Sequence, residues 1–507
     1  MADDDPPSEV ELKLEVPAEA VERLRAHPLI AALAPPKLLE STYFDTPQLE
    51  LKAKALTLRL RSDGSDGASR MQTVKTLGGA AGLFDRGEWE TPVAGDLPDL
   101  DAASPVRAAL KGRVKRLKPL FAVKVERASG LVRDRGSEIE LSLDLGEVQT
   151  DAGSAPLKEV ELELKRGRPK RLFELAERLF EAAPLRLSAR SKAEAGFDLI
   201  EQRDAVKAGH VALDRGMTTA AAFQKIGRAC LAHFLRNERI VRERRTVESV
   251  HQARVGVRRL RAAMTLFKDL LQDSQSQALK AQLRDLARRL SAARDLDVLI
   301  ERIDQIELAA PVDLAALVAA LERRREAAYD DAAAALAAPE ASRLAFEVAA
   351  WLETGWWLTA RDDLHSARRD LPVADFAATE LARRTRKLRK RAPRLAQLAP
   401  PERHEVRKAA KKVRYGAEFF HSLAKKKDRA AADAFVEALK PLQDVMGELN
   451  DVAVAQALLG ALSASEPGPV DYAAGAVVEE MSRQTDPLLR RATKAAKAFA
   501  GVKGFLD

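Results

Sequence analysis

Near its start the chain reads Glu9-Val10-Glu11-Leu12-Lys13-Leu14-Glu15-Val16, in which a charged residue alternates with an apolar one. Successive side chains of a β-strand point to opposite faces, so this pattern predicts a strand with one charged face and one apolar face. Neighbouring carboxylates on one face repel each other. The charged face is therefore favourable either in water or against ligands that neutralise it. Taken alone, the stretch favours the solvated face.

The same alternation recurs in three other stretches, which are residues 58–61, 138–144 and 159–165. Acidic residues dominate two of them and the third is purely basic, whereas solvent-facing strands usually mix single charges with Thr, Ser and Gln. Carboxylates bind hard divalent cations, and Arg and Lys bind phosphate groups. Strands that separate acids from bases therefore favour a ligand that is polyanionic and metal-bound.

Further motifs in this half of the chain complete a family pattern. The pattern consists, in order, of Glu9-x-Glu11-x-Lys13, Thr42-Tyr43-Phe44-Asp45-Thr46, Arg59-x-Arg61, Lys75, Arg127 and the strand at 159–165. With these motifs, residues 1 to about 200 resemble the CYTH, or triphosphate tunnel metalloenzyme, domain. The resemblance implies an α+β fold that begins with an antiparallel β-barrel, a tunnel with a charged interior, and helices packed outside it. We expect those helices at about 18–34, 105–117 and 169–182.

The resemblance also implies a role for each matching residue. The catalytic set would be Glu9, Glu11, Lys13, Arg59 and Arg61. The ligands of a divalent metal, Mg²⁺ or Mn²⁺, would be Glu9, Glu11, Asp144, Glu161 and Glu163. Phosphate groups of the substrate would contact Lys75, Arg86, Arg127, Lys165 and Lys192. Two alternatives stay open, since Lys165 could instead pair with a strand neighbour, and Glu88, Glu90, Glu138 and Glu140 could be rim or solvent residues.

The second half of the chain differs from the first in net charge and in amino-acid composition. Residues 201–507 hold 53 Lys and Arg against 42 Asp and Glu, while residues 1–200 hold 31 against 34. A positive excess confined to one region indicates an acidic partner there. A chain of 507 residues also exceeds what one hydrophobic core serves. We expect a tunnel domain at 1–203, a linker at 204–216 and an all-helical domain at 217–507, which is rich in Ala, Leu and Arg.

The helical half contains an internal repeat. His251, Arg254, Arg258, Arg259 and Arg261 recur 153 positions later as His404, Arg407, Lys411, Lys412 and Arg414. On a helix, the first, second, third and fifth members of each set form one cationic stripe opposite an apolar face. Like charges spaced this way repel by a few tenths of a kcal/mol per pair. Keeping the stripe in both copies suggests that an external polyanion neutralises it, although a solvated basic face is the alternative.

A second pair of related segments, ending at Asp295-Leu296-Asp297 and Leu449-Asn450-Asp451, follows the two stripes with an offset of 156. With the His-headed helices these segments resemble the CHAD domain over residues 218 to 505. The resemblance implies two helical bundles around a basic cavity that binds inorganic polyphosphate through the ten residues of the repeat. Arg294, Asp295 and Asp451 would instead form structural salt bridges.

Several classes of protein are excluded by what the sequence lacks. Cys230 is the single cysteine, which leaves no disulfide framework and no Cys-based metal site. The acidic start is not a signal peptide, and we expect no apolar run that approaches a membrane span. No Walker-type loop is present, so side chains must hold phosphates. The expected location is the cytoplasm, with polyphosphate granules as a site of association.

The sequence thus predicts a metal-dependent inorganic triphosphatase joined to a polyphosphate-binding helical domain. Competing functions are adenylate cyclase or thiamine-triphosphatase activity in the same type of tunnel, since fold does not settle the reaction. A non-catalytic polyphosphate-binding scaffold is another alternative. Binding of nucleic acid by the helical half is the least favoured reading, because no basic patch interleaves with the aromatic residues.

Overall fold

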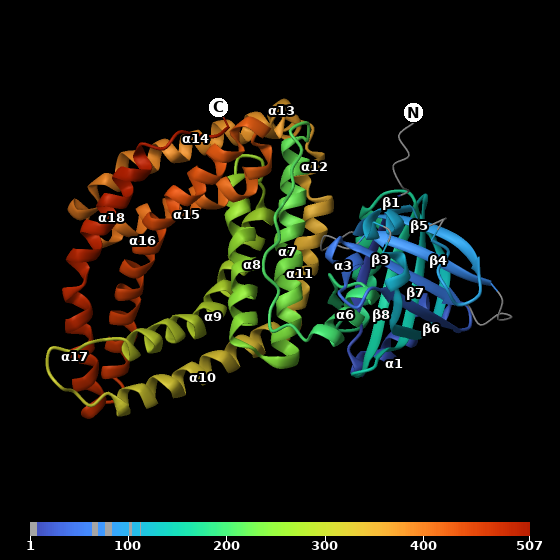
Figure 1. Cartoon of the computed structure of the whole chain (residues 1–507), viewed down its shortest axis with the longest axis horizontal. Coiled ribbons are helices and arrows are strands. Elements are labelled where there is room, and N and C mark those ends of the chain that lie inside the picture. The colour runs from blue at the N-terminus through green and yellow to red at the C-terminus, as the bar shows by residue number, and fades with distance from the viewer. Residues whose placement is uncertain (1–7, 63–68, 77–83, 101–103, 112, 507) are drawn as a thin grey trace. The chain divides into compact units, whose positions relative to one another are not determined.

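The computed structural model describes residues 8–62, 69–76, 84–100, 104–111 and 113–506. The chain forms two compact units, drawn in Figure 1. The first unit comprises Met1–Val206 and Pro339–Gly355, and the second comprises Lys207–Ala338 and Trp356–Asp507. The break between them after Val206 lies in the predicted linker. The assignment of residues 339–355 to the first unit was not expected from the sequence.

The first unit is built on an antiparallel sheet. Its strands are β1 (Ser8–Glu15), β2 (Lys37–Asp45), β3 (Leu56–Ser62), β4 (Ser69–Thr76), β5 (Phe84–Ala94), β6 (Lys118–Asp134), β7 (Ser137–Thr150), β8 (Gly153–Arg166) and β9 (Arg186–Leu187). They follow the order β5-β4-β3-β2-β6-β7-β8-β1-β9, and β1 pairs in addition with β5. The four alternating stretches of the sequence lie in β1, β3, β7 and β8, which confirms that they form strands.

Helices bury the apolar face of the sheet. They are α1 (Val21–Arg25), α2 (Pro28–Ala31), α3 (Glu50–Ala53), α4 (Ser104–Leu110), α5 (Lys170–Ala182) and α6 (Lys192–Glu201). Leu12 and Leu14 of β1 are fully buried. In α4, Val106 and Leu110 join a core cluster with Leu58 of β3. The charged residues that alternate with these apolar ones consequently face the other side of the strands.

Two of the three predicted outer helices are shorter than expected. The stretch 18–34 divides into a 3₁₀ turn and the helices α1 and α2, because Pro28 has no backbone N–H and holds His27 in an extended conformation. The stretch 105–117 ends its helix at Leu110, since Lys111 adopts a left-handed φ of 45°. The third prediction, 169–182, is confirmed by α5.

The second unit is all-helical, as expected. Its helices are α7 (Thr219–Arg244), α8 (Val247–Leu266), α9 (Ser274–Asp304), α10 (Ala315–Ala337), α12 (Trp356–Thr359), α13 (Asp363–Asp370), α14 (Val373–Arg391), α15 (Pro400–Phe420), α16 (Arg429–Ser463), α17 (Pro469–Arg483) and α18 (Thr485–Ala500). The predicted apolar faces are buried, including Val257 and Leu260 of α8 and Ala410 and Val413 of α15. Proline begins several helices, but Pro441 lies inside α16, where buried neighbours hold the helix together.

One helical stretch, Lys426–Ser463, is long and apolar enough to cross a membrane by length and composition alone. The expectation that no apolar run approaches a membrane span is therefore wrong by this measure, because α16 carries no charged residue after Asp451. A core helix meets the same measure. Phe435, Leu439 and Leu442 of α16 lie in the hydrophobic core of the second unit, and 33% of its most apolar window is buried.

Candidate functional site

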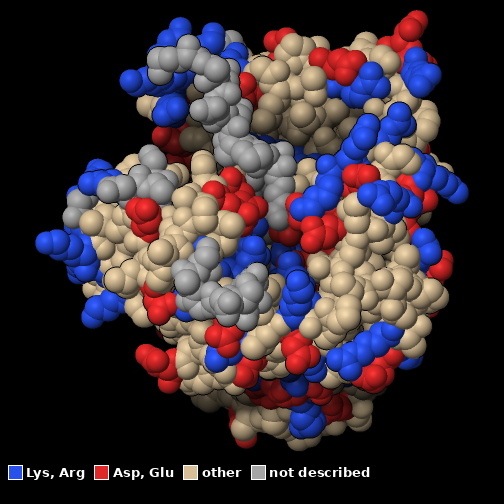
Figure 2. All heavy atoms as spheres, turned by 90° about the vertical axis from the view of Figure 1, so that its right-hand side faces the viewer, with Lys and Arg blue, Asp and Glu red and all other residues tan. Residues whose placement is uncertain are grey.

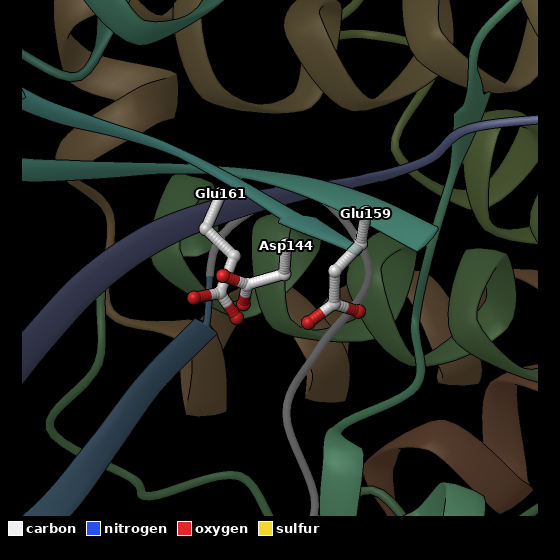
Figure 3. Close-up of side chains that lie close together, drawn as sticks. All are labelled: Asp144, Glu159 and Glu161. Carbon is white, nitrogen blue, oxygen red and sulfur yellow. The ribbon is translucent and has the colours of Figure 1, made fainter. Parts of the chain in front are cut away.

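Three buried carboxylates meet on the charged face of the first unit. Asp144 of β7 lies directly opposite Glu159 of β8, and Glu161 is two residues further along the same strand. Each of the three offers an oxygen within 4.8 Å of the others. Figure 3 shows their carboxyl groups extending from the same side of the two strands. Three carboxylates this close and this buried repel strongly, so they require cations.

Three basic side chains supply those cations. Lys192, the first residue of α6, places Nζ 2.8 Å from both Asp144 Oδ2 and Glu161 Oε1, and it also pairs with Glu159. Arg127 of β6 donates from Nε and Nη2 to the two Asp144 oxygens at 2.7 and 2.6 Å, and it reaches Glu161. On β1, Lys13 pairs with Glu161 and with Glu11, the latter at 3.3 Å. The acidic triad is therefore enclosed by three cations.

The cations affect the three carboxyl groups unequally. Burial opposes ionisation of Glu161, but Lys13, Lys192 and Arg127 together hold its pKa well below the usual value. Burial likewise opposes ionisation of Asp144, but Lys192 and Arg127 outweigh this effect and lower its pKa. For Glu159, burial and the neighbouring carboxylates outweigh the attraction of Lys192 and Lys13 and raise the pKa. Glu159 is thus the triad member whose charge the protein compensates least.

A cavity of about 330 Å³ opens on this face of the strands. Glu161 lines it, together with Glu11 and Glu163, while Asp144 and Glu159 lie outside its lining. Figure 2, which faces this unit, shows Lys and Arg side chains within a hollow and acidic side chains beside it. A set of carboxylate oxygens suits a hard divalent cation such as Mg²⁺ or Mn²⁺. The residues present therefore fit a metal of this class.

Basic residues from β3 and β4 line the same cavity. Lys75 pairs with Glu88 at 3.0 Å, and Arg61 lies 3.8 Å from Glu90. Burial opposes the charge of Arg59, but Tyr43, Glu88 and Glu90 raise its pKa, so it stays a guanidinium. Its Nε atom is buried and has no hydrogen-bond partner among the described residues. A buried donor without a partner costs free energy, which favours an anion in this part of the cavity.

In the second unit, Arg254 and Arg258 of α8 and Arg407 and Lys411 of α15, all members of the two cationic stripes, form one cluster. Burial and the charges of Arg407, Arg258 and Arg254 lower the pKa of Lys411 to about 7, with Asp451 acting in the opposite sense. Arg254 lies 3.8 Å from Asp295. The Nε atoms of Arg258 and Arg407 and Nδ1 of His251 are buried and find no hydrogen-bond partner in the described part of the chain. Cations this poorly compensated favour a bound polyanion.

The remaining members of the repeat also have neighbours outside this cluster. Arg259 and Arg414 both pair with Glu418, at 3.1 and 2.6 Å, so their charges are compensated within the protein. Burial lowers the pKa of Arg261, and the charge of the nearby Arg284 lowers it further. Burial and the charge of Arg384 lower the pKa of Lys412 in the same way. His404 lies at the head of the second stripe, where burial and the neighbouring Lys408 lower its pKa.

Two family models match the chain. The model of the CYTH domain matches residues 7–197, and the model of the CHAD domain matches residues 225–460. The chain is a CYTH domain followed by a CHAD domain. This confirms both resemblances drawn from the sequence.

Individual relatives cover parts of the chain. An inorganic triphosphatase of Haemophilus influenzae is 30% identical over 167 residues, which are 31% of this chain and 45% of the relative, so the match spans less than half of that protein. The solved CHAD domain of Ricinus communis is 29% identical, with a TM-score of 0.49, over 59% of this chain and 98% of that chain. A putative adenylate cyclase of Bacillus halodurans is 18% identical, with a TM-score of 0.29, over 37% of this chain and 95% of that chain.

The CYTH cavity brings together most of the residues that the sequence nominated. Its lining includes Glu11, Lys13, Arg59, Arg61, Lys75, Arg127, Glu161, Glu163, Lys165 and Lys192. Asp144 lies in the acidic triad. Lys165 lines the cavity and pairs with Glu163 at 2.6 Å and with Glu140 at 3.0 Å. Its pairing with strand neighbours is therefore observed, and its contact with phosphate stays a prediction. Glu9 and Arg86 occupy paired positions of β1 and β5, but their side chains lie outside the described residues.

Glu159 is a member of the triad that was not predicted as a site residue from the sequence. The signal was present, because Glu159 continues the alternation of Glu161 and Glu163 along β8. Glu88 and Glu90, for which the sequence leaves a rim or solvent position open, line the cavity and pair with Lys75 and Arg61.

Proposed function

We propose that the CYTH domain hydrolyses inorganic triphosphate with Mg²⁺ or Mn²⁺. The observation that carries the proposal is a single cavity lined by buried carboxylates from β1 and β8 and by Arg and Lys from β3, β4 and β6. This separation of charge suits a metal-bound chain of phosphates. The family of the domain and the triphosphatase of Haemophilus influenzae support the same class of reaction.

In the proposed reaction, a water oxygen attacks the terminal phosphorus, the bond to the bridging oxygen breaks, and orthophosphate and pyrophosphate leave. Arg59, Arg61 and Lys75 bind the phosphate oxygens and neutralise the charge that builds on the transferred group. Glu11 or Glu163, which both line the cavity, would orient the attacking water. A divalent ion held by Glu161 and its neighbours would supply further charge stabilisation.

The strands would close into a barrel around this substrate. The pairing of β1 with β5 joins the first and the eighth strands of the nine-stranded order, and it supports closure of a tunnel. We place the CYTH domain at 1–203, a linker at 204–216 and the CHAD domain at 217–507, with helix α11 (Pro339–Thr354) as the exception described below.

For the CHAD domain we propose binding of inorganic polyphosphate in the cluster of Arg254, Arg258, Arg407 and Lys411. The support is the lowered pKa of Lys411, caused by burial and by three neighbouring guanidinium groups, together with buried donors that lack partners among the described residues. We also propose a cytoplasmic location with association with polyphosphate granules.

A panel of substrates tests the reaction. Triphosphate, long-chain polyphosphate, ATP and thiamine triphosphate would each be supplied with Mg²⁺ or Mn²⁺, and every product would be identified. We expect orthophosphate and pyrophosphate from triphosphate at the highest kcat/KM. Cyclic AMP from ATP, or preferred cleavage of thiamine triphosphate, would replace the proposal with one of its alternatives. If none of the substrates is turned over, the alternative of a non-catalytic polyphosphate-binding scaffold replaces the proposal.

A further inference from the structure

Helix α11 belongs to one domain by sequence and to the other by structure. Its residues, Pro339–Thr354, lie within the stretch that the CHAD model matches, yet they form part of the compact unit that contains the CYTH domain. One helix of the CHAD sequence is therefore part of the unit that contains the CYTH domain.

The contacts of α11 with this unit resemble a core rather than a surface. Phe346 is 1% exposed, and its ring centroid lies 4.4 Å from Phe180 and 5.9 Å from Phe173 on α5. Arg343 pairs with Glu177, also on α5. Packed aromatic rings and a charge pair fix the helix to α5.

A buried hydrogen bond connects α11 to the strand system. The Ser342 hydroxyl donates to the Leu185 carbonyl oxygen at 2.6 Å, and both residues are buried. Leu185 directly precedes β9, which pairs with β1 through Leu187 opposite Leu14 and Arg186 opposite Glu15. The bond consequently ends next to the strand that carries Glu11 and Lys13.

Segment 185–192 positions both lysines that contact the acidic triad, Lys13 and Lys192. Ser188 N donates to the Lys13 carbonyl oxygen at 2.9 Å, which fixes the backbone from which Lys13 reaches Glu161. Four residues later the same segment ends in Lys192, whose Nζ lies 2.8 Å from Glu161 Oε1. The Ser191 capping box with Glu194 sets the start of α6 at this point.

We propose that Ser342 of α11 is a positioning residue for the CYTH active site, acting through segment 185–192 on Lys13 and Lys192. The CYTH domain is then incomplete without residues 339–355 of the CHAD sequence. The catalytic part of this inference rests on the proposed triphosphatase function. Its structural part concerns the two lysines around the triad and holds independently of the substrate.

The test uses the full chain with Ser342→Ala, which removes the donor and leaves the fold of α11 intact. We expect kcat for triphosphate to fall roughly tenfold while KM changes little, because the phosphate-binding residues of β3 and β4 are not attached to this segment. The affinity for Mn²⁺, measured without substrate by calorimetry, should change by several-fold, since Lys13 and Lys192 compete with the ion for Glu161.

Matched variants separate positioning from loss of structure. Ser482→Ala in α17 removes a serine hydroxyl that donates within its own helix to the Val478 carbonyl oxygen at 2.7 Å, at an exposed position, and it should change neither readout. Arg343→Glu should behave as Ser342→Ala does, and adding Glu177→Arg should restore part of the loss. Unchanged kcat and unchanged Mn²⁺ affinity in a folded Ser342→Ala variant would overturn the proposal. If the wild-type chain does not hydrolyse triphosphate, the proposed function fails, and the Mn²⁺ measurement still decides the role of Ser342.

Discussion

Lys192 Nζ lies 2.8 Å from Asp144 Oδ2, so an ammonium group is in direct contact with the acidic triad. The ammonium also contacts Glu159 and Glu161. Burial opposes its charge, but the three carboxylates raise the pKa of Lys192 well above the usual value. A divalent ion that binds this triad must compete with an internal cation.

The first prediction follows from that competition. Lys192→Met should destabilise the chain without metal by about 3–5 kcal/mol at pH 7, because it removes one of the three cations that compensate the buried carboxylates. Mn²⁺ should then raise the melting temperature of the variant more than that of the wild-type chain. Thermal denaturation with and without Mn²⁺ measures both effects. An equal Mn²⁺ effect on both proteins would show that the ion does not bind at the triad.

The second prediction concerns the carboxylates that line the cavity. Glu161→Gln and Glu11→Gln should each abolish metal-dependent hydrolysis, since the amide keeps the size of the side chain and loses the charge that binds the ion. Glu19→Gln, at an exposed position outside the cavity, is the matched control and should retain full activity. Circular dichroism would verify that all three variants fold. Full activity in both cavity variants would refute the assignment of the tunnel.

The third prediction concerns Arg59, whose buried Nε atom lacks a partner among the described residues. Arg59→Ala should lower kcat/KM for triphosphate by a factor that corresponds to about 2–4 kcal/mol, the usual effect of removing an electrostatic clamp from a transition state. Arg23→Ala removes an exposed arginine and should leave the kinetics unchanged. A change below twofold for Arg59→Ala would place the phosphates elsewhere in the cavity.

The sequence predicted the charged faces of the strands better than their surroundings. Alternation in β1 and β8 placed Glu11 and Glu161 on charged strand faces, because the period of a strand determines which side chains share a face. The family resemblance then nominated both as metal ligands. The same logic covers Glu159, which the family motif did not single out. The predicted helix at 18–34 was too long because Pro28 interrupts it.

The docking of α11 could not be predicted. Periodicity shows that a helix has a buried face, but it does not identify the partner of that face. The partner residues of Phe346, which are Phe173 and Phe180, lie more than 160 positions earlier in the chain. In the CHAD domain, likewise, the repeat grouped Arg259 and Arg414 with the other cations, whereas Glu418 of α15 compensates both.

The fourth prediction uses the titration of Lys411. Burial and three nearby guanidinium groups lower its pKa to about 7 in the free protein. A bound polyanion stabilises the ammonium and raises that pKa, so binding takes up a proton above pH 7. The contribution of Lys411 to polyphosphate affinity should therefore be constant below pH 7. Above pH 7 the affinity should fall as pH rises, by up to tenfold per pH unit. Fluorescence binding assays from pH 6 to 9 measure this slope.

Two variants identify the titrating group. Lys411→Arg keeps the positive charge at all these pH values and should remove most of the slope. Lys408→Arg changes an exposed lysine that pairs with Glu405 at 2.8 Å and should preserve it. Burial lowers the pKa of His251 and of His404, so any proton uptake by these groups appears at more acidic pH. A slope that survives Lys411→Arg would assign the proton to a different residue.

The fifth prediction separates a polyphosphate site from an ordinary basic surface. Binding to phosphates releases counterions, so affinity for long-chain polyphosphate should fall steeply and linearly on a logarithmic salt scale. The double change Arg258→Glu and Lys411→Glu should weaken binding roughly tenfold or more and reduce that slope. The control, Arg386→Glu with Lys390→Glu, reverses two exposed cations of α14 and should have a much smaller effect. Duplex DNA at equal phosphate concentration should compete poorly, since we expect the cluster to bind phosphates without contacting base edges. Equal losses in the two double variants, or DNA binding as tight as that of polyphosphate, would show that the stripes of α8 and α15 are solvated basic faces.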